Sequence, residues 1–86
     1  MTDQKGLILI VEDDMQTRRF LRTSLSHHGW RVIEANDGKT AIEKVKSEPP
    51  DLVILDLGLP DMDGIDLTRK LRFSSDLPIL VLSART

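Results

Sequence analysis

The sequence contains no cysteine and no tyrosine, and its aromatic residues are one tryptophan and two phenylalanines among 86 residues. Without cysteine there is no disulfide framework and no thiol chemistry. No apolar run approaches the length that spans a bilayer. Residues 1–6 also lack the succession of charged, apolar and small residues that marks a signal peptide. These absences favour a cytoplasmic protein that does not associate with membranes.

An excess of positive charge is lacking as well. The chain has 12 lysines and arginines against 14 acidic residues, for a net charge of -2. Nucleic-acid-binding domains usually carry a basic patch, so we expect no direct nucleic-acid binding by this chain. With 40% hydrophobic and 30% charged residues, the composition is that of a globular protein. Its length is enough for one small domain, so residues 1–86 are expected to form a single domain.

Two uninterrupted apolar runs are each followed directly by acidic residues. Residues 7–11 precede Glu12 and Asp13, and residues 52–55 precede Asp56. Short apolar runs without alternation are typical of strands buried on both faces of a parallel sheet. Ligands bind outside the carboxyl ends of such strands, so these acids are better placed for chemistry than for packing.

Segments with helical spacing alternate with the strand segments. The expected helices cover about 15–28, the segment between a turn at 36–38 and Pro49, and 65–72; further strands are expected at 32–33 and 79–82. In the first helix, the residues that recur at helical spacing are Thr17, Phe20, Leu21, Ser24, Leu25 and His28. In the third helix, the expected inner residues are Ile65, Leu71 and either Leu67 or Thr68.

This alternation predicts an α/β fold with a doubly wound parallel sheet and right-handed crossovers. In the flavodoxin-like strand order 2-1-3-4, the first, third and fourth strands are neighbours. Their carboxyl ends would bring Glu12, Asp13, Asp56 and Ser83 to one edge of the sheet.

Three carboxylates that meet at one point repel each other, so either their pKa values rise or a cation lies among them. Mg²⁺ suits such ligands, because it binds one or two carboxylates and keeps waters that a phosphate can replace. A metal held by Asp13, with Glu12 acting through water, would neutralise a phosphoryl group arriving at Asp56. An aspartate carboxylate is a nucleophile for such a transfer, and the Ser83 hydroxyl would donate to a phosphoryl oxygen.

Each feature has a simpler explanation. Acids before a helix complement its dipole, which accounts for residues 12–14 without any ligand. A serine at a strand end often bonds its own backbone, which accounts for Ser83. The coincidence of these residues at corresponding strand ends is what favours a site.

Three motifs, in this order, resemble the receiver domain of two-component response regulators of the OmpR/PhoB class. They are ILIVEDD at 8–14, LVILDLGLPDMDG at 52–64 and LPILVLSAR at 77–85. The resemblance implies a CheY-like fold and a phosphoacceptor, Asp56, that takes its phosphoryl group from a sensor histidine kinase. It implies Mg²⁺ bound directly by Asp13 and through water by Glu12, with Asp56 and the backbone carbonyl of Gly58 as further ligands. It also implies that Ser83 is the switch hydroxyl, and that catalysis is at most self-phosphorylation and self-dephosphorylation.

The resemblance also has gaps. Receivers continue through a fourth helix, a fifth strand and a fifth helix, and they carry a lysine after the fifth strand. No lysine follows Lys70 in these 86 residues, and we expect this chain to carry no DNA-binding output domain. The sequence therefore predicts an incomplete receiver in which strand 79–82 is an apolar, unpaired edge. Such an edge is a template for another chain, so self-association through it, or through a swapped element, is expected.

Two functional classes remain open. The chain is either a phosphoacceptor module, or an interaction fragment that binds a kinase or a partner regulator without productive phosphorylation. A haloacid-dehalogenase-type phosphatase also uses an aspartate at a strand end. That family expects a second acid two residues later, where this chain has Gly58, so we discount this third class.

Overall fold

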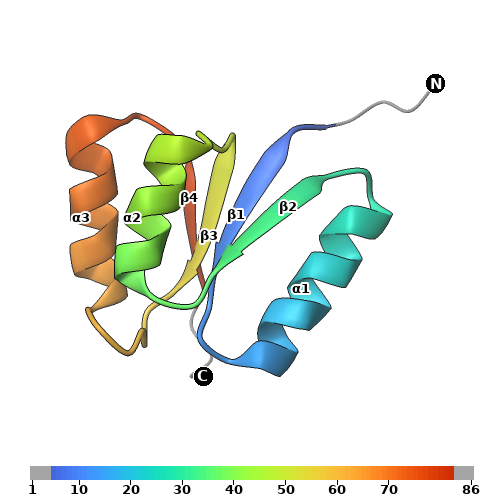
Figure 1. Cartoon of the computed structure of the whole chain (residues 1–86), viewed down its shortest axis with the longest axis horizontal. Helices are drawn as coiled ribbons and strands as arrows, with labels where there is room; N and C mark the ends of the chain where they lie inside the picture. The colour runs from blue at the N-terminus through green and yellow to red at the C-terminus, as the bar shows by residue number, and fades with distance from the viewer. Residues whose placement is uncertain (1–4, 83–86) are drawn as a thin grey trace.

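The computed structural model describes residues 5–82, which form alternating strands and helices (Figure 1). The elements are β1 (Leu7–Val11), α1 (Met15–His27), β2 (Arg31–Ala35), α2 (Gly38–Ser47), β3 (Leu52–Asp56), α3 (Gly64–Ser74) and β4 (Ile79–Leu82). The four strands are parallel and lie in the order β2-β1-β3-β4. The predicted fold class and strand order are therefore confirmed.

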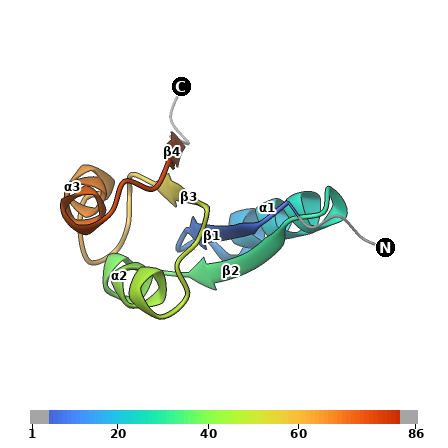
Figure 2. The same cartoon turned by 90° about the horizontal axis from the view of Figure 1, so that it is seen from above.

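Helices cover both faces of the sheet, with α1 on one face and α2 and α3 on the other (Figure 2). The larger core lies under α2 and α3 and includes Leu9, Leu55 and Leu67. The smaller core lies under α1, where Leu21 and Leu25 pack against β1 and β3. The central strands β1 and β3 are thus buried on both sides, which explains their uninterrupted apolar sequences.

Each helix begins at an aspartate that caps its first turn. Asp14 accepts a hydrogen bond from the Thr17 N–H at 2.9 Å, and Asp37 accepts one from the Thr40 N–H at 2.7 Å. Asp63 accepts one from the Ile65 N–H at 2.9 Å. These side chains satisfy backbone donors that have no partner within the helix. Two of these helix starts, after β1 and after β3, fix the turns that carry the acidic residues.

Two predicted inner positions are wrong. Phe20 is 69% exposed and Ile65 is 52% exposed. In α1, the stripe that reaches the sheet consists of Leu21 and Leu25, and Phe20 lies about 100° around the helix from Leu21. In α3, Leu67 and the residue four positions later, Leu71, are the buried pair. The other apolar positions that the spacing places on the inner faces, Leu21, Leu25, Leu67 and Leu71, do pack against the sheet. The prediction therefore fails at Phe20 and Ile65 and holds for the other apolar residues of each stripe.

Strand β4 forms one edge of the described sheet and pairs only with β3 there. Its residues Leu80, Val81 and Leu82 are all exposed, Leu80 by 50%. The predicted apolar edge is confirmed for the described part of the chain. Among residues 5–82, no helix is long and apolar enough to cross a membrane.

Candidate acidic site at the strand ends

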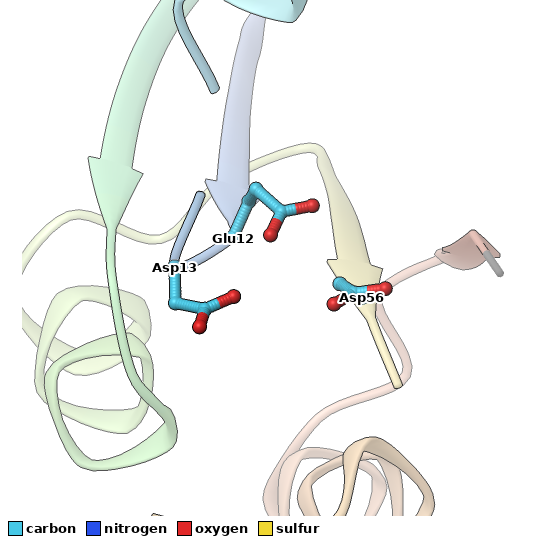
Figure 3. A group of neighbouring side chains, drawn as sticks. All are labelled: Glu12, Asp13 and Asp56. Carbon is cyan, nitrogen blue, oxygen red and sulfur yellow. The ribbon is translucent and has the colours of Figure 1, made fainter. Parts of the chain in front are cut away.

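Three carboxylates gather where β1 and β3 end (Figure 3). Glu12 and Asp13 follow β1 directly, and Asp56 is the last residue of β3. Because Val11 is the register partner of Leu55, Glu12 and Asp56 lie level at the same edge of the sheet. Each of the three residues offers a carboxylate oxygen within 4.8 Å of the others. The predicted convergence of these residues is thus present.

The three acids differ in their surroundings. Glu12 is buried, Asp56 is half-buried and Asp13 is exposed. Burial is the largest cause that raises the pKa of Glu12, because it penalises the charged form. A hydrogen bond with Asp13 and the charges of Asp56 and Asp13 raise this pKa further, against a lowering by the Asp14 N–H. The charged form of Glu12 is therefore disfavoured chiefly by burial and in addition by the two neighbouring acids, and a bound cation would favour it.

The turn after β1 is held by hydrogen bonds on every side of Glu12. Its N–H donates to the Ala35 carbonyl at 3.0 Å, and its carboxylate accepts from the Asp14 N–H at 3.0 Å. Its own carbonyl accepts from Nη1 of Arg18 at 2.8 Å. Sequence reasoning missed the arginine. The available signal was a cation in the early part of a helix, where the dipole disfavours positive charge.

The loop after β3 is tied to the start of α2. The carboxylate of Asp61 accepts hydrogen bonds from the N–H groups of Gly38 at 2.8 Å and Lys39 at 3.0 Å. These two donors lower the pKa of Asp61. Such a link, between positions more than twenty residues apart, was also missed from the sequence. It fixes the far end of the loop that leads away from Asp56.

Gly58 lies beside the carboxylate of Asp56, in the loop that follows β3. A Cβ atom at Gly58 would be 3.7 Å from Oδ2 of Asp56, which is an ordinary contact distance. Gly58 also forms an isolated bridge with Asp63. Ser83, the predicted switch hydroxyl, lies outside the described residues.

The donor set fits Mg²⁺. All three side chains offer hard carboxylate oxygens, and no softer nitrogen or sulfur ligand belongs to the group. Burial raises the pKa of Glu12, and the neighbouring charges of Asp56 and Asp13 raise it further. A divalent cation supplies compensating positive charge without any change of side chain.

Comparison with known families identifies the class of protein. The family described as response regulator receiver domain matches residues 8–86. The chain belongs to this family, as its three motifs had indicated. Receiver domains are in general signalling domains rather than enzymes; they interact with histidine kinases and bind Mg²⁺ in an acidic pocket.

The similar curated proteins are transcriptional regulators. The chain is 52% identical over 79 residues to the KDP operon transcriptional regulatory protein KdpE of Escherichia coli K12, covering 92% of this chain and 35% of that protein. It is 48% identical over 79 residues to the response regulator MprA of Mycolicibacterium vanbaalenii, covering 91% and 34% respectively. The chain therefore spans about a third of the length of these relatives.

Solved receiver structures share the fold. The N-terminal domain of a response regulator receiver protein from Methanoculleus marisnigri matches with a TM-score of 0.91 at 32% identity, over 95% of this chain and 69% of that one. The BeF3-activated receiver domain of Klebsiella pneumoniae RstA matches with a TM-score of 0.89 at 36% identity, over 93% and 68%. The likeness supports a receiver fold from β1 to β4.

Proposed function

We propose that this chain is a phosphoacceptor that receives a phosphoryl group on Asp56 from a phosphohistidine of a sensor histidine kinase in the cytoplasm. The observation that carries the proposal is the meeting of Glu12, Asp13 and Asp56 at the ends of adjacent strands. Asp56 is half-buried and is the last residue of the buried strand β3, so its backbone is rigidly placed. A fixed nucleophile beside two further acids suits phosphoryl transfer, which depends mainly on positioning and electrostatics.

The proposed step conserves atoms and charge. An oxygen of the Asp56 carboxylate forms a bond to phosphorus as the bond from phosphorus to the histidine nitrogen breaks. The electron pair of that bond stays on the imidazole, and the product is an acyl phosphate on Asp56. Hydrolysis reverses the state: water attacks the phosphorus, inorganic phosphate leaves and the carboxylate is restored. We propose that both reactions are catalysed by the receiver's own residues.

Asp13 would hold Mg²⁺ directly and Glu12 through water, with Asp56 and the backbone carbonyl of Gly58 completing the protein ligands. When bound, the ion supplies the positive charge that offsets the phosphoryl oxygens. The exposure of Asp13 leaves its side of the cluster open to solvent, as a metal that keeps several waters requires. Ser83 is proposed to donate its hydroxyl to the phosphoryl group.

Intact-mass spectrometry after incubation with acetyl phosphate tests the proposal. With Mg²⁺ we expect one phosphate adduct, and without Mg²⁺ little or none. Asp56→Asn is the variant that removes the acceptor, and Asp76→Asn is the matched control in an exposed loop. An adduct that persists in Asp56→Asn, or no adduct in a folded wild-type sample, would contradict the proposal. In the second case, kinase binding without phosphorylation would support the interaction-fragment alternative.

We also propose that the 86-residue chain pairs with a second copy of itself through β4. Three consecutive exposed apolar residues end this strand. The Pro78 carbonyl accepts from the Val53 N–H, so by the alternation of a parallel ladder the backbone groups of Ile79 and Val81 point away from β3. An edge with free donors, free acceptors and apolar side chains is suited to strand pairing.

The orientation of these groups gives a sharp test of self-association. Val81→Pro removes an outward N–H while leaving the bonds to β3 in place, and Val81→Ala is the control that keeps the N–H. We expect light scattering across a concentration series to show a dimer for wild type and Val81→Ala, and a monomer for Val81→Pro. A wild-type chain that stays monomeric and folded at every concentration would overturn the pairing.

A further inference from the structure

Arg18 on α1 connects the acidic site to β2. Its Nη1 donates to the carbonyl of Glu12 at 2.8 Å, and its Nε donates to Oε1 of Glu34 at 2.9 Å. The side chain is only 20% exposed, so its guanidinium is held rather than free to rotate in solvent. A planar group that donates in two directions fixes both partners relative to each other.

Glu34 in turn holds the arginine in place. Its second oxygen, Oε2, accepts from Nη1 of Arg22 at 2.7 Å, so one carboxylate lies between two guanidinium groups. Glu34 is the register partner of Ile10 in β1, two residues before Glu12. The sheet therefore sets the orientation of Arg18. Because Glu34 belongs to β2, this strand supports the hydrogen bond from Arg18 to the Glu12 carbonyl.

We propose that Arg18 is a positioning residue of the acidic site: by fixing the carbonyl of Glu12, it sets the direction in which the carboxylates of Glu12 and Asp13 project toward Asp56. This inference rests on the proposed Mg²⁺-dependent function of the cluster. The carbonyl that Arg18 holds belongs to the peptide that joins Glu12 to Asp13. Rotation of that peptide would therefore redirect both acids.

Positioning and simple charge predict opposite results, which makes the role testable. A positive charge close to a cation site weakens cation binding, so its removal would tighten Mg²⁺ binding if charge were all that mattered. Loss of a positioning contact would instead weaken Mg²⁺ binding, since outer contacts of metal ligands commonly contribute about tenfold or more in affinity.

Mg²⁺ titration by calorimetry on the wild-type chain, Arg18→Met and Arg22→Met separates the two. Arg22 is the matched control, because it is on the same helix and bonds the same Glu34, but it makes no bond to Glu12 among the described contacts. We expect the Mg²⁺ Kd to rise about tenfold in Arg18→Met, and to change by less than about twofold in Arg22→Met because exposed ion pairs contribute little. Arg18→Lys should also weaken Mg²⁺ binding, because a lysine ammonium cannot reproduce the paired geometry with which the guanidinium donates to both the Glu12 carbonyl and Glu34. Unchanged or tighter binding in Arg18→Met would overturn the proposal.

A second measurement separates this proposal from the proposed function. If the wild-type chain binds no Mg²⁺, the proposed function fails, but amide hydrogen exchange in metal-free protein still tests Arg18. The Asp14 N–H bonds to the Glu12 carboxylate, so its exchange reports the geometry of the turn. We expect faster exchange in Arg18→Met than in wild type and Arg22→Met, and equal exchange in all three would overturn the positioning role. Urea unfolding confirms that each variant is folded, and Arg18→Lys replaces Arg18→Met in both measurements should the latter fail to fold.

Discussion

Gly64, the first residue of α3, lies directly against the backbone of Asp56. A Cβ atom at Gly64 would be 2.7 Å from the carbonyl oxygen of Asp56 and 2.7 Å from the Cα of Leu57. The N–H of Gly64 also donates to the Leu57 carbonyl at 2.9 Å. The start of α3 and the end of β3 are thus in contact through their backbones, which leaves no room for any side chain at position 64.

Gly64→Ala should therefore displace the backbone of Asp56. Because both clashing atoms are backbone, the strain cannot be relieved by a side-chain rotation. We expect a loss of about 1–3 kcal/mol in the free energy of unfolding and slower phosphorylation by acetyl phosphate. Gly58→Ala is the control in the same loop, where the added Cβ meets only Asp56 Oδ2 at 3.7 Å. Similar effects of the two substitutions in urea unfolding would contradict this explanation.

Glu12→Gln is expected to change the free energy of unfolding in opposite directions in the absence and in the presence of Mg²⁺. Its pKa is raised in the folded protein, chiefly by burial, so above that pKa the charged carboxylate costs stability, and the cost disappears as the pH falls below the ordinary value of 4.5. Glu12→Gln removes this cost and keeps an oxygen for the Asp14 N–H. At neutral pH in EDTA we expect it to raise the free energy of unfolding by about 0.5–1 kcal/mol.

Added Mg²⁺ should reverse this order. A cation that binds only the folded state stabilises it, and the wild-type chain has one more charged acid with which to bind it. Thermal unfolding of wild type and Glu12→Gln, with and without Mg²⁺, measures which of the two is more stable in each condition. Glu43→Gln, at an exposed position on α2, is the control. A Glu12→Gln variant that is less stable than wild type in EDTA would show that the carboxylate is stabilised by its surroundings rather than strained.

These features differ in how far the sequence alone predicts them. The topology and the meeting of Glu12 with Asp56 follow from sequence, because buried parallel strands have uninterrupted apolar runs and their ends are marked by the residues that come next. The bonds of Arg18 to Glu12 and of Asp61 to α2 do not. They depend on where long polar side chains and loops reach across the molecule, and the apolar periodicity of a helix carries no information on the partners of its polar residues.

The link between Asp61 and α2 predicts a pH dependence. The pKa of Asp61 is lowered by the N–H groups of Gly38 and Lys39. The stabilisation from this carboxylate is therefore fully present above its ordinary pKa of 3.8, and it is lost as the pH falls through the lower folded-state value. We expect Asp61→Asn to be less stable than wild type at pH 7. The gap should narrow below pH 3.8 as the wild-type carboxylate becomes protonated.

Urea unfolding at a series of pH values measures this gap directly. Asp76→Asn changes an exposed carboxylate in another loop and serves as the control for the loss of one negative charge. A gap between wild type and Asp61→Asn that stays constant across the acidic range would mean that protonation of the Asp61 carboxylate does not change the stability of the fold. The observed effect would then come from a change in packing rather than from the charge of Asp61.

The rotation of α3 about its own axis decides which of its residues face the sheet, and this rotation can be tested by substitution. Ile65, Leu67 and Leu71 cannot share one stripe, because positions 65 and 67 lie about 200° apart around a helix. The structure buries Leu67 completely and leaves Ile65 about half exposed. Leu67→Ala should therefore cost about 2–5 kcal/mol by opening a cavity under the sheet, whereas Ile65→Ala should change the free energy of unfolding by less than about 0.5 kcal/mol. Equal costs in urea unfolding would mean that α3 is rotated from its described orientation. Gly64, one residue before Ile65, would then no longer face the backbone of Asp56.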